Sequence, residues 1–385
     1  MRITLLGPAH PYRGGIATFN ERLARQYISE CKEVDIRTFS LQYPKFFFPG
    51  KTQFTENPPP PDIRILREIN SINPLNWLRM GFRLKKEKPD ILLVRYWTPF
   101  LAPCLGTISR IVRSNKYTVV ISLVDNALPH EKHPGDRCLT KFFINGIDGA
   151  AVLSDTVQRD VLDFRNDIPV SMAPHPLFDN YGEKISRSEA LKALKLDPAF
   201  SYLLFFGFIR NYKGLDILLE AFAGKELKNK NLKLLVAGEF YENETSYHKQ
   251  AAESGIEKDV IFFNRFINDD EVKLFFCAAD LVVQPYKSAT QSGVTQIAYH
   301  FDKPMLVTDV GGLKEMVPHE KCGYVVKPQA EEISAAINDY FSNNRSEEFT
   351  KSVMKEKTKF SWNKATEAIN EVFYRCLLKQ LIKDL

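Results

Sequence analysis

The chain has 385 residues, enough for about two domains that each bury a sizeable core. Its 44% hydrophobic and 26% charged residues argue against wholesale disorder, and the near balance of 52 basic and 47 acidic side chains argues against a dedicated nucleic-acid binder. The six cysteines include no Cys-x-x-Cys pair, so they indicate neither a disulfide framework nor a zinc site, and we expect a reducing, cytoplasmic environment.

The apolar stretches of the chain are all short. The N-terminal one is too short for a signal peptide, and charged residues interrupt every later one before it could span a bilayer. We therefore expect a protein that is neither exported nor membrane-spanning.

The first half of the chain alternates between strand and helix patterns. A short apolar strand at residues 3–6 leads through a glycine-bearing loop into a helical pattern from about Ile16 to Ser29, and strand character returns at residues 34–39. Further strands are predicted at 90–97, 117–125 and 149–155. This order predicts a parallel sheet, so residues 1–175 are interpreted as one Rossmann-like domain.

The second half repeats the alternation after a proline-containing linker between Val170 and Tyr181 and a charged helix at 186–196. Strands are predicted at 202–208, 232–238, 260–263, 280–286 and 304–310, and helices at 215–223, 245–254, 270–279, 294–301 and 331–342. The pattern predicts a second doubly wound domain over residues 176–360. The amphipathic stretch from residue 361 could pack against either half.

Strand-to-helix loops are where ligands are expected, because open α/β sheets bind them beyond the carboxyl ends of the strands. We expect the two domains to face each other across a cleft lined by such loops. The first of these loops places Gly14 and Gly15 just ahead of a helix, where the backbone can approach an anion or a sugar. The alternative is a tight turn that only starts the helix.

A second loop follows the strand at 202–208 and sets Arg210 and Lys213 three residues apart before a helix. Two cations there could grip a diphosphate, with Arg210 as a fork and Lys213 as a point charge. The alternative is a solvated basic turn.

A third loop, residues 124–136, holds two histidines and a glutamate, but not at the His-Glu-x-x-His spacing of a helical metal site. We expect no metal. The functional interpretation is a polar loop in which Asp125 or His130 touches a hydroxylated acceptor, and the alternative is an ordinary surface loop.

The fourth loop leads into the helix predicted at 294–301, with Ser292 as its N-cap. The backbone N–H groups near Gly293, Val294 and Thr295 could then hold phosphate without a charged side chain. The alternative is a capped helix whose polar residues serve only the turn.

Together the four loops resemble retaining glycosyltransferases of the GT-B fold, in particular family 4. The matching segments are RGGIATFN, FFGFIRNYKGLDILLEAF, LVVQPYKSATQSGVTQIAYHFDKPMLVTDVGGLKEMV and the late FSW. They span most of the chain in the family's order. The resemblance implies two Rossmann-like domains, with the helix over 361–385 returning to the first domain.

The resemblance also implies roles for the domains and for single residues. The second domain would bind a nucleotide-diphosphate sugar as co-substrate without a metal or other cofactor, and the first would bind the acceptor. Lys213 matches the lysine that neutralises the donor diphosphate, and Gly15 matches the glycine loop beside the donor phosphates. The family's arginine follows the glycine directly, where this chain has Phe208, so Arg210 is a proposed substitute.

The chain departs from the family in the fourth loop. The two usual glutamates, one for the sugar hydroxyls and one for the ribose, fall on Ala289 and Ile297. The polar residues left to contact the donor are Gln291, Thr295 and their neighbours, and Glu315 one loop further on. Side-chain amides and hydroxyls are therefore expected to replace the carboxylates.

The resulting hypothesis is transfer of a sugar to a glycan or lipid-linked acceptor, with retention of anomeric configuration, in assembly of a surface polysaccharide or related glycoconjugate. The alternatives are a nucleotide-sugar epimerase or hydrolase on the same fold and a donor-binding protein without catalysis. Aromatic and basic residues at 44–51 and 73–88 are typical of segments that touch a membrane surface, which suits a lipid-linked acceptor at its cytoplasmic face. The alternative is buried aromatics beside a solvated basic face.

Overall fold

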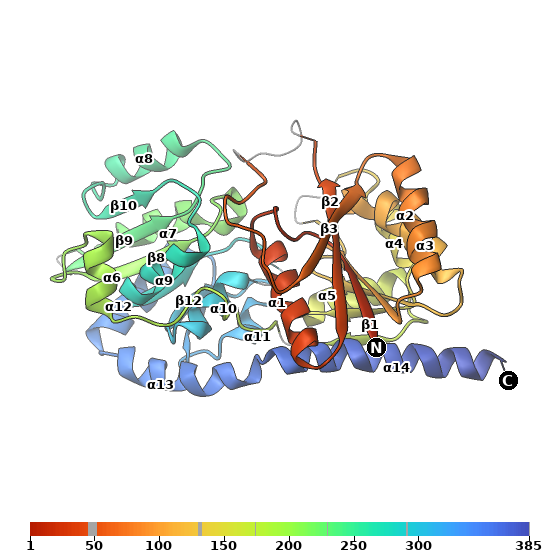
Figure 1. Ribbon diagram of the computed structural model, residues 1–385. Coiled ribbons are helices and arrows are strands. Elements are labelled where there is room, and N and C mark those ends of the chain that lie inside the picture. The colour runs from red at the N-terminus through yellow and green to blue at the C-terminus, as the bar shows by residue number, and fades with distance from the viewer. Residues whose placement is uncertain (45–51, 130–132, 174, 229, 290–291, 385) are drawn as a thin grey trace. The chain divides into compact units, whose positions relative to one another are not determined.

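The computed structural model describes residues 1–384 except 45–51, 130–132, 174, 229 and 290–291. The chain forms two compact units, one of residues 1–176 and 361–385 and the other of residues 177–360 (Figure 1). Each unit is a parallel sheet covered by helices, so the two predicted α/β sheets are confirmed. No helix in the described part of the chain combines the length and the apolar character needed to cross a membrane.

Sheet A of the first unit has seven parallel strands in the order β3-β2-β1-β4-β5-β6-β7. The strands are β1 (Arg2–Leu6), β2 (Glu33–Leu41), β3 (Arg64–Asn70), β4 (Ile91–Tyr96), β5 (Val119–Val124), β6 (Gly149–Val152) and β7 (Val170–Met172). The helices are α1 (Gly15–Ser29), α2 (Pro74–Glu87), α3 (Ala102–Arg113), α4 (Asp136–Ile144), α5 (Asp155–Phe164) and α14 (Trp362–Asp384).

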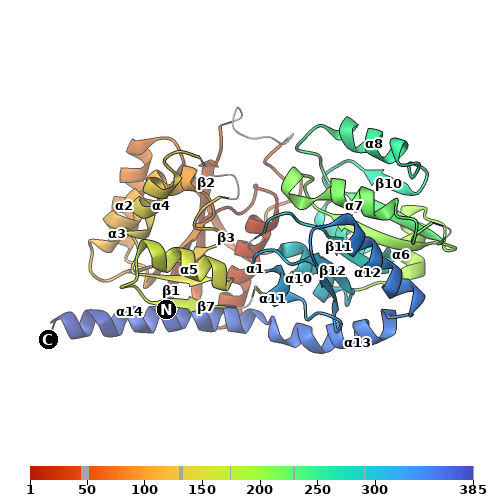
Figure 2. The same cartoon turned by 180° about the vertical axis from the view of Figure 1, so that it is seen from behind.

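Alternate residues of these strands face two helical layers. Leu92, Val94 and Tyr96 belong to the core shared with α2, α3, α4 and α5. Helices α1 and α14 contact each other, and α1 also contacts β2. Figures 1 and 2 show α14 running alongside the sheet of this unit. Residues 361–385 therefore belong to the first unit, joined to it by contacts of α14 with β5, β6 and β7.

Sheet C of the second unit has six parallel strands in the order β10-β9-β8-β11-β12-β13. The strands are β8 (Ser201–Phe206), β9 (Leu232–Ala237), β10 (Val260–Phe263), β11 (Leu281–Gln284), β12 (Met305–Thr308) and β13 (Gly323–Val326). The α-helices are α6 (Arg187–Leu194), α7 (Leu215–Phe222), α8 (Glu244–Glu253), α9 (Asp269–Ala278), α10 (Gly293–His300), α11 (Leu313–Met316), α12 (Ala330–Ser342) and α13 (Ser346–Glu356). The order reverses between β8 and β11, which is the point where doubly wound sheets bind ligands.

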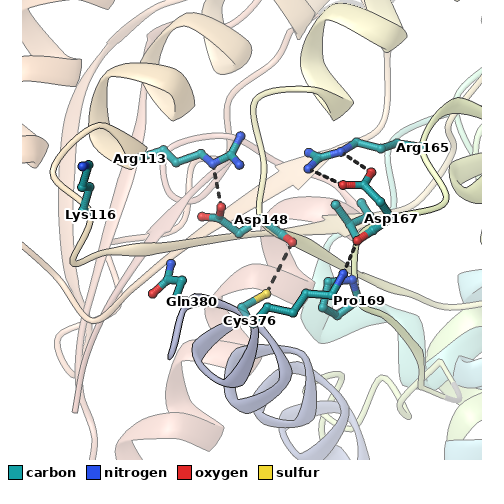
Figure 3. Close-up of a pocket in the computed structure, with 10 residues that line it drawn as sticks. Arg113, Lys116, Asp148, Arg165, Asp167, Pro169, Cys376 and Gln380 are labelled. Atoms are coloured by element: carbon teal, nitrogen blue, oxygen red, sulfur yellow. Dashed lines mark hydrogen bonds and ion pairs between the residues drawn. The ribbon is translucent and has the colours of Figure 1, made fainter. Parts of the chain in front are cut away.

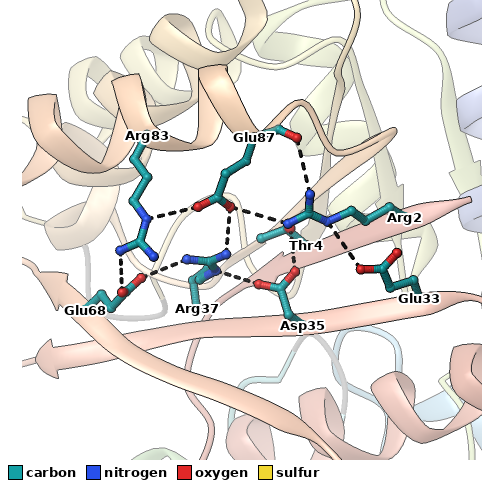
Figure 4. Close-up of polar contacts among 8 residues, drawn as sticks. All are labelled: Arg2, Thr4, Glu33, Asp35, Arg37, Glu68, Arg83 and Glu87. Atoms are coloured by element: carbon teal, nitrogen blue, oxygen red, sulfur yellow. Dashed lines mark hydrogen bonds and ion pairs between the residues drawn. The ribbon is translucent and has the colours of Figure 1, made fainter.

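A buried arginine ties α2 to sheet A (Figure 4). Arg37, on β2, is almost fully buried and bonds three carboxylates, those of Asp35 at 2.5 Å, Glu68 at 2.9 Å and Glu87 at 2.7 Å. The more exposed Arg83 on α2 bonds the same two glutamates from the other side. Because the charges are mutually satisfied, the cluster can stay buried between β2, β3 and α2.

Candidate functional site

The loop after β8 is fixed against the end of β11. The backbone N–H of Lys287 donates to the carbonyl of Tyr212 at 2.7 Å. Gly214 has a φ of +71°, and a Cβ at this position would lie 2.0 Å from the carbonyl oxygen of Pro285. Only glycine fits such a close approach. Lys213, the residue before it, is therefore held at the switch point of sheet C.

Lys213 is a buried cation. Its side chain is 9% exposed, its Nζ lies 5.6 Å from the centre of the Tyr286 ring, and no carboxylate in the described part of the chain pairs with it. Burial, together with the nearby positive charge of Arg210, lowers the pKa of Lys213 to about 8. A buried ammonium without a counter-ion is costly, so this group is arranged to receive an anion.

The N-terminus of α10 lies beside this ammonium. Ser292 is the N-cap residue, as predicted, but its hydroxyl lies 3.3 Å from the hydroxyl of Tyr286 and does not cap the helix. No acceptor among the described residues takes the backbone N–H groups of Gly293, Val294 and Thr295. The partial positive charge of a helix N-terminus is thus left for a ligand.

Gly207 lies close both to Lys213 and to the first turn of α10. A Cβ at Gly207 would lie 2.9 Å from Nζ of Lys213 and 3.8 Å from Cγ2 of Val294, and its φ of +99° favours glycine. The Lys213 ammonium and Val294, in the first turn of α10, therefore both lie close to Gly207 at the carboxyl edge of sheet C. Together they make a site suited to a phosphate or diphosphate.

Arg210 is half-buried and lies close to the same loop. Its guanidinium carbon is 5.0 Å from the centre of the Tyr241 ring, and Tyr241 in turn packs on Phe208 at 4.6 Å. Phe208, at the position where the resemblance implies an arginine, also faces Phe266, with the ring centres 6.2 Å apart. An aromatic cluster thus stands where a cation is usual, and Arg210 is placed against its edge by a cation–π contact.

The fourth loop and helix α10 contain the two positions at which the resemblance implies glutamates. Ala289 and Ile297 are both buried. The hydroxyl of Thr295 donates to Oε1 of Gln284 at 3.1 Å, so its side chain is engaged within the protein. Gln291 lies outside the described residues. Glu315 is exposed on α11.

Gln284, the partner of Thr295, was not among the predicted site residues. Its Nε2 is buried and has no hydrogen-bond partner among the described residues, and the same holds for both polar atoms of the Gln296 side chain on α10. Buried amides without partners are uncommon in folded proteins. The only sequence signal was a glutamine at the end of an otherwise apolar strand, DLVVQPY.

The first unit holds the other predicted residues. Gly14 has a φ of +104° and precedes α1, whose first residue is Gly15. Asp125 follows β5 directly and binds Arg95 of β4 through both carboxylate oxygens, one of them at 2.7 Å from Nε. Arg95 was not predicted as a site residue, although it is the one charge within β4, ILLVRY. His130 lies outside the described residues.

The Asp125–Arg95 pair is buried beside α1. The guanidinium carbon of Arg95 lies 4.0 Å from the centre of the Phe19 ring, and a Cβ at Gly7 would come within 2.9 Å of Cβ of Arg95. Asp125 is therefore positioned rigidly at the carboxyl edge of sheet A, with its charge balanced. In the described part of the chain no group of three or more histidine, cysteine, aspartate or glutamate side chains could hold a metal ion.

The class of fold follows from these two sheets and from solved structures. HepE of Anabaena, solved in complex with UDP, superposes with a TM-score of 0.74 at 15% identity and covers 97% of this chain and 100% of that one. WaaG, a glycosyltransferase involved in lipopolysaccharide biosynthesis, gives a TM-score of 0.66 at 18% identity over 93% of this chain and 94% of that one. The fold is of the GT-B type, two Rossmann-like domains.

The family match lies in the second unit. Residues 186–360 match the family model of glycosyl transferases group 1. An uncharacterized glycosyltransferase of Methanocaldococcus jannaschii is 30% identical over 176 residues, which cover 44% of this chain and 43% of that protein. The lipopolysaccharide core mannosyltransferase LpsB of Rhizobium meliloti is 24% identical over 226 residues, or 57% of this chain and 60% of that protein. The chain thus spans less than half of the length of the first relative and 60% of the length of the second.

Proposed function

We propose that the protein is a retaining glycosyltransferase that moves a sugar from a nucleotide-diphosphate sugar to a glycan or lipid-linked acceptor in surface polysaccharide or glycoconjugate biosynthesis. One observation carries the proposal: the buried Lys213 ammonium, without a carboxylate among the described residues, lies beside Gly207, as does Val294 in the first turn of α10. The group 1 match over residues 186–360 and the binding of UDP by the structurally similar HepE support it.

In this proposal the chemistry is mainly electrostatic. Breaking the bond between the sugar and the phosphate builds negative charge on the leaving diphosphate and positive charge on the sugar. Lys213, Arg210 and the N–H groups of Val294 and Thr295 would stabilise the first of these charges. Asp125 and His130 of the first domain would contact the acceptor, and no metal takes part.

Incubation with a panel of nucleotide sugars, with and without lipid-linked acceptors, tests the activity. We expect acceptor-dependent release of a nucleoside diphosphate and a product of retained configuration. Release without acceptor would instead indicate a hydrolase, interconversion of the nucleotide sugar an epimerase, and tight binding without turnover a donor-binding protein.

The affinity for a nucleoside diphosphate should depend on pH through Lys213. The free protein holds this lysine at a pKa of about 8, and a bound diphosphate would raise that pKa because it favours the charged form. Affinity should therefore be constant below pH 8 and should fall about ten-fold for each pH unit above it. Calorimetric titrations with UDP and GDP between pH 7 and pH 9.5 measure this slope.

Lys287→Met provides the control for this pH dependence. Lys287 lies on the next loop but is already paired with Asp216 at 2.7 Å, so its removal should leave the slope unchanged. Lys213→Met should bind weakly at every pH. A steep slope that persists in Lys213→Met would assign the titration to another group.

Helix α2 is the proposed contact with an anionic membrane. Leu75 is 77% and Phe82 59% exposed, and with Leu78 they form an outward apolar stripe flanked by the exposed Arg79 and Lys86. An apolar stripe flanked by basic residues is typical of helices that lie on membranes. The other predicted segment, 44–51, falls almost entirely outside the described residues.

Flotation with vesicles tests this contact. The protein should float with vesicles that contain phosphatidylglycerol at low salt, and a Leu75→Ser/Phe82→Ser variant should lose most of that binding. The matched control is Ile28→Ser/Met354→Ser, which removes two exposed apolar side chains from α1 and α13. Equal loss in both variants, or no flotation of the native chain, would contradict the proposal.

A further inference from the structure

The first unit contains a second basic site, well separated from the carboxyl edge of its sheet. A cavity of about 400 Å³ opens among the segments that precede β5, β6 and β7 and the last turns of α14. These segments form the amino edge of sheet A, opposite the loops that carry Gly14, Gly15 and Asp125. The cavity therefore belongs to neither the donor site nor the acceptor site proposed above.

Four cationic side chains line this cavity against two carboxylates (Figure 3). The cations are Arg113, Lys116, Arg165 and Lys379, and the carboxylates are Asp148 and Asp167. Four positive charges less two negative ones leave an excess of two. A phosphate group at neutral pH carries a charge of roughly minus 1.5 to minus 2, which matches this excess.

The carboxylates are already bonded within the wall. Arg113 holds Asp148 at 2.6 Å, and the backbone N–H of Val120 donates to the same carboxylate at 2.9 Å. Arg165 holds Asp167 through two contacts, at 2.8 and 3.2 Å. Both acids thus orient arginine forks and do not project freely into the cavity.

Lys116 differs from the two arginines. No hydrogen bond or ion pair of its side chain joins it to the described residues, and Figure 3 shows it standing apart from the bonded groups. Its backbone is in the left-handed region, with a φ of +55°, at the tight turn between α3 and β5. A lysine at such a turn has its ammonium available for an anion.

We propose that this cavity binds a phosphate group, held by the ammonium groups of Lys116 and Lys379 and by the guanidinium of Arg113. The guanidinium of Arg165 is already bonded to Asp167 and to the carbonyl of Ile147 and completes the wall. The phosphate is either that of a soluble phosphate ester or that of an anionic lipid headgroup. A lipid headgroup could reach the cavity because exposed apolar residues lie on the same turns of α14 as Lys379 and Gln380 of the cavity wall. These residues are Leu378, Leu381 and Ile382. The inference does not depend on the proposed transferase activity.

Binding can be measured without interference from the donor site. Inorganic phosphate and glycerol 3-phosphate are titrated calorimetrically into protein that carries Lys213→Met, so that the site on sheet C does not contribute. One molecule should bind per chain. Lys116→Glu and Lys379→Glu should each weaken binding by about ten-fold or more, because each reverses a charge at the phosphate.

Lys364→Glu is the matched control, since Lys364 is exposed near the start of the same helix and does not line the cavity. It should bind phosphate like the parent. Vesicles of phosphatidylglycerol in phosphatidylcholine form the second arm. Loss of vesicle binding in the two cavity variants, without binding of soluble phosphate, would identify a lipid headgroup as the source.

Two outcomes would overturn the inference. One is that neither soluble phosphate nor anionic vesicles bind in a way that Lys116→Glu and Lys379→Glu weaken. The other is that Lys364→Glu weakens binding as much as the cavity variants do, which would mean that only overall charge matters. Thermal unfolding of each variant shows that a loss of binding is not a loss of fold.

Discussion

Lys213→Met should lose at least about 100-fold in turnover and yet unfold at a higher temperature than the native chain. The loss follows because the variant lacks the cation that stabilises the leaving diphosphate, and removal of one such group commonly costs two to three orders of magnitude. The higher unfolding temperature follows because burial holds the pKa of Lys213 at about 8 against an ordinary value of 10.5. The charged form of this lysine is therefore disfavoured in the folded state.

The sign and size of the stability change follow from proton binding. Between pH 8 and pH 10.5 the unfolded chain binds more protons at Lys213 than the folded chain, so native stability rises with pH across this window. Below pH 8 the folded protein bears the full cost of a charged, buried Lys213, about 3 kcal/mol. Methionine removes this cost while keeping most of the side-chain volume. Urea unfolding at pH 7 and steady-state turnover measure the two effects.

Lys287→Met is again the matched comparison, since this lysine is neutralised by Asp216. It should keep near-native turnover and should lose a little stability. Near-normal transfer by Lys213→Met would refute the assignment of Lys213. A loss of both turnover and stability in that variant would mean that the lysine serves the fold and not the ligand.

Arg37→Met should destabilise the first unit by about 3–5 kcal/mol at pH 7, because it leaves three carboxylates around a buried position without their shared cation. Burial alone would raise the pKa of Glu68, but Arg37 and Arg83 bring it below its ordinary value. Without Arg37 that pKa should rise. The loss of stability in Arg37→Met should therefore shrink as the pH falls from 7 towards 4, where the carboxylates become protonated and neutral.

Arg83→Met tests the role of burial in this effect. Arg83 bonds the same two glutamates, but its side chain is 46% exposed, so its removal should cost less than about 1 kcal/mol. Urea unfolding of both variants at pH 7 and pH 5 gives the comparison. Equal costs for the two arginines, or a deficit in Arg37→Met that grows as the pH falls, would contradict this account of the cluster.

The sequence predicted the central strands of both sheets and the edge strand β10, but it missed the edge strands β3 and β13. β4 and β5 are apolar on both faces because helices cover both, and such runs are visible without a structure. β3 at one edge of sheet A contains the charged residues Arg64, Arg67 and Glu68, and β13 at one edge of sheet C is only four residues long. Edge strands bury less surface, so their patterns are weaker.

The candidate site was predicted as single residues and not as a geometry. The loop pattern and the family resemblance pointed to Lys213 and to the start of α10 as separate features. Their proximity depends on Gly207, which lies close both to Lys213 and to Val294, far along the sequence. The partner of Asp125 could not be predicted either, because Arg95 lies on the neighbouring strand, 30 residues away.

The structure of this chain with a bound nucleoside diphosphate tests the central claim most directly. We predict that a phosphate oxygen lies within about 3 Å of Nζ of Lys213 and of a backbone N–H at the start of α10. Diphosphate bound elsewhere, with the Lys213 ammonium still without an anion, would contradict the account.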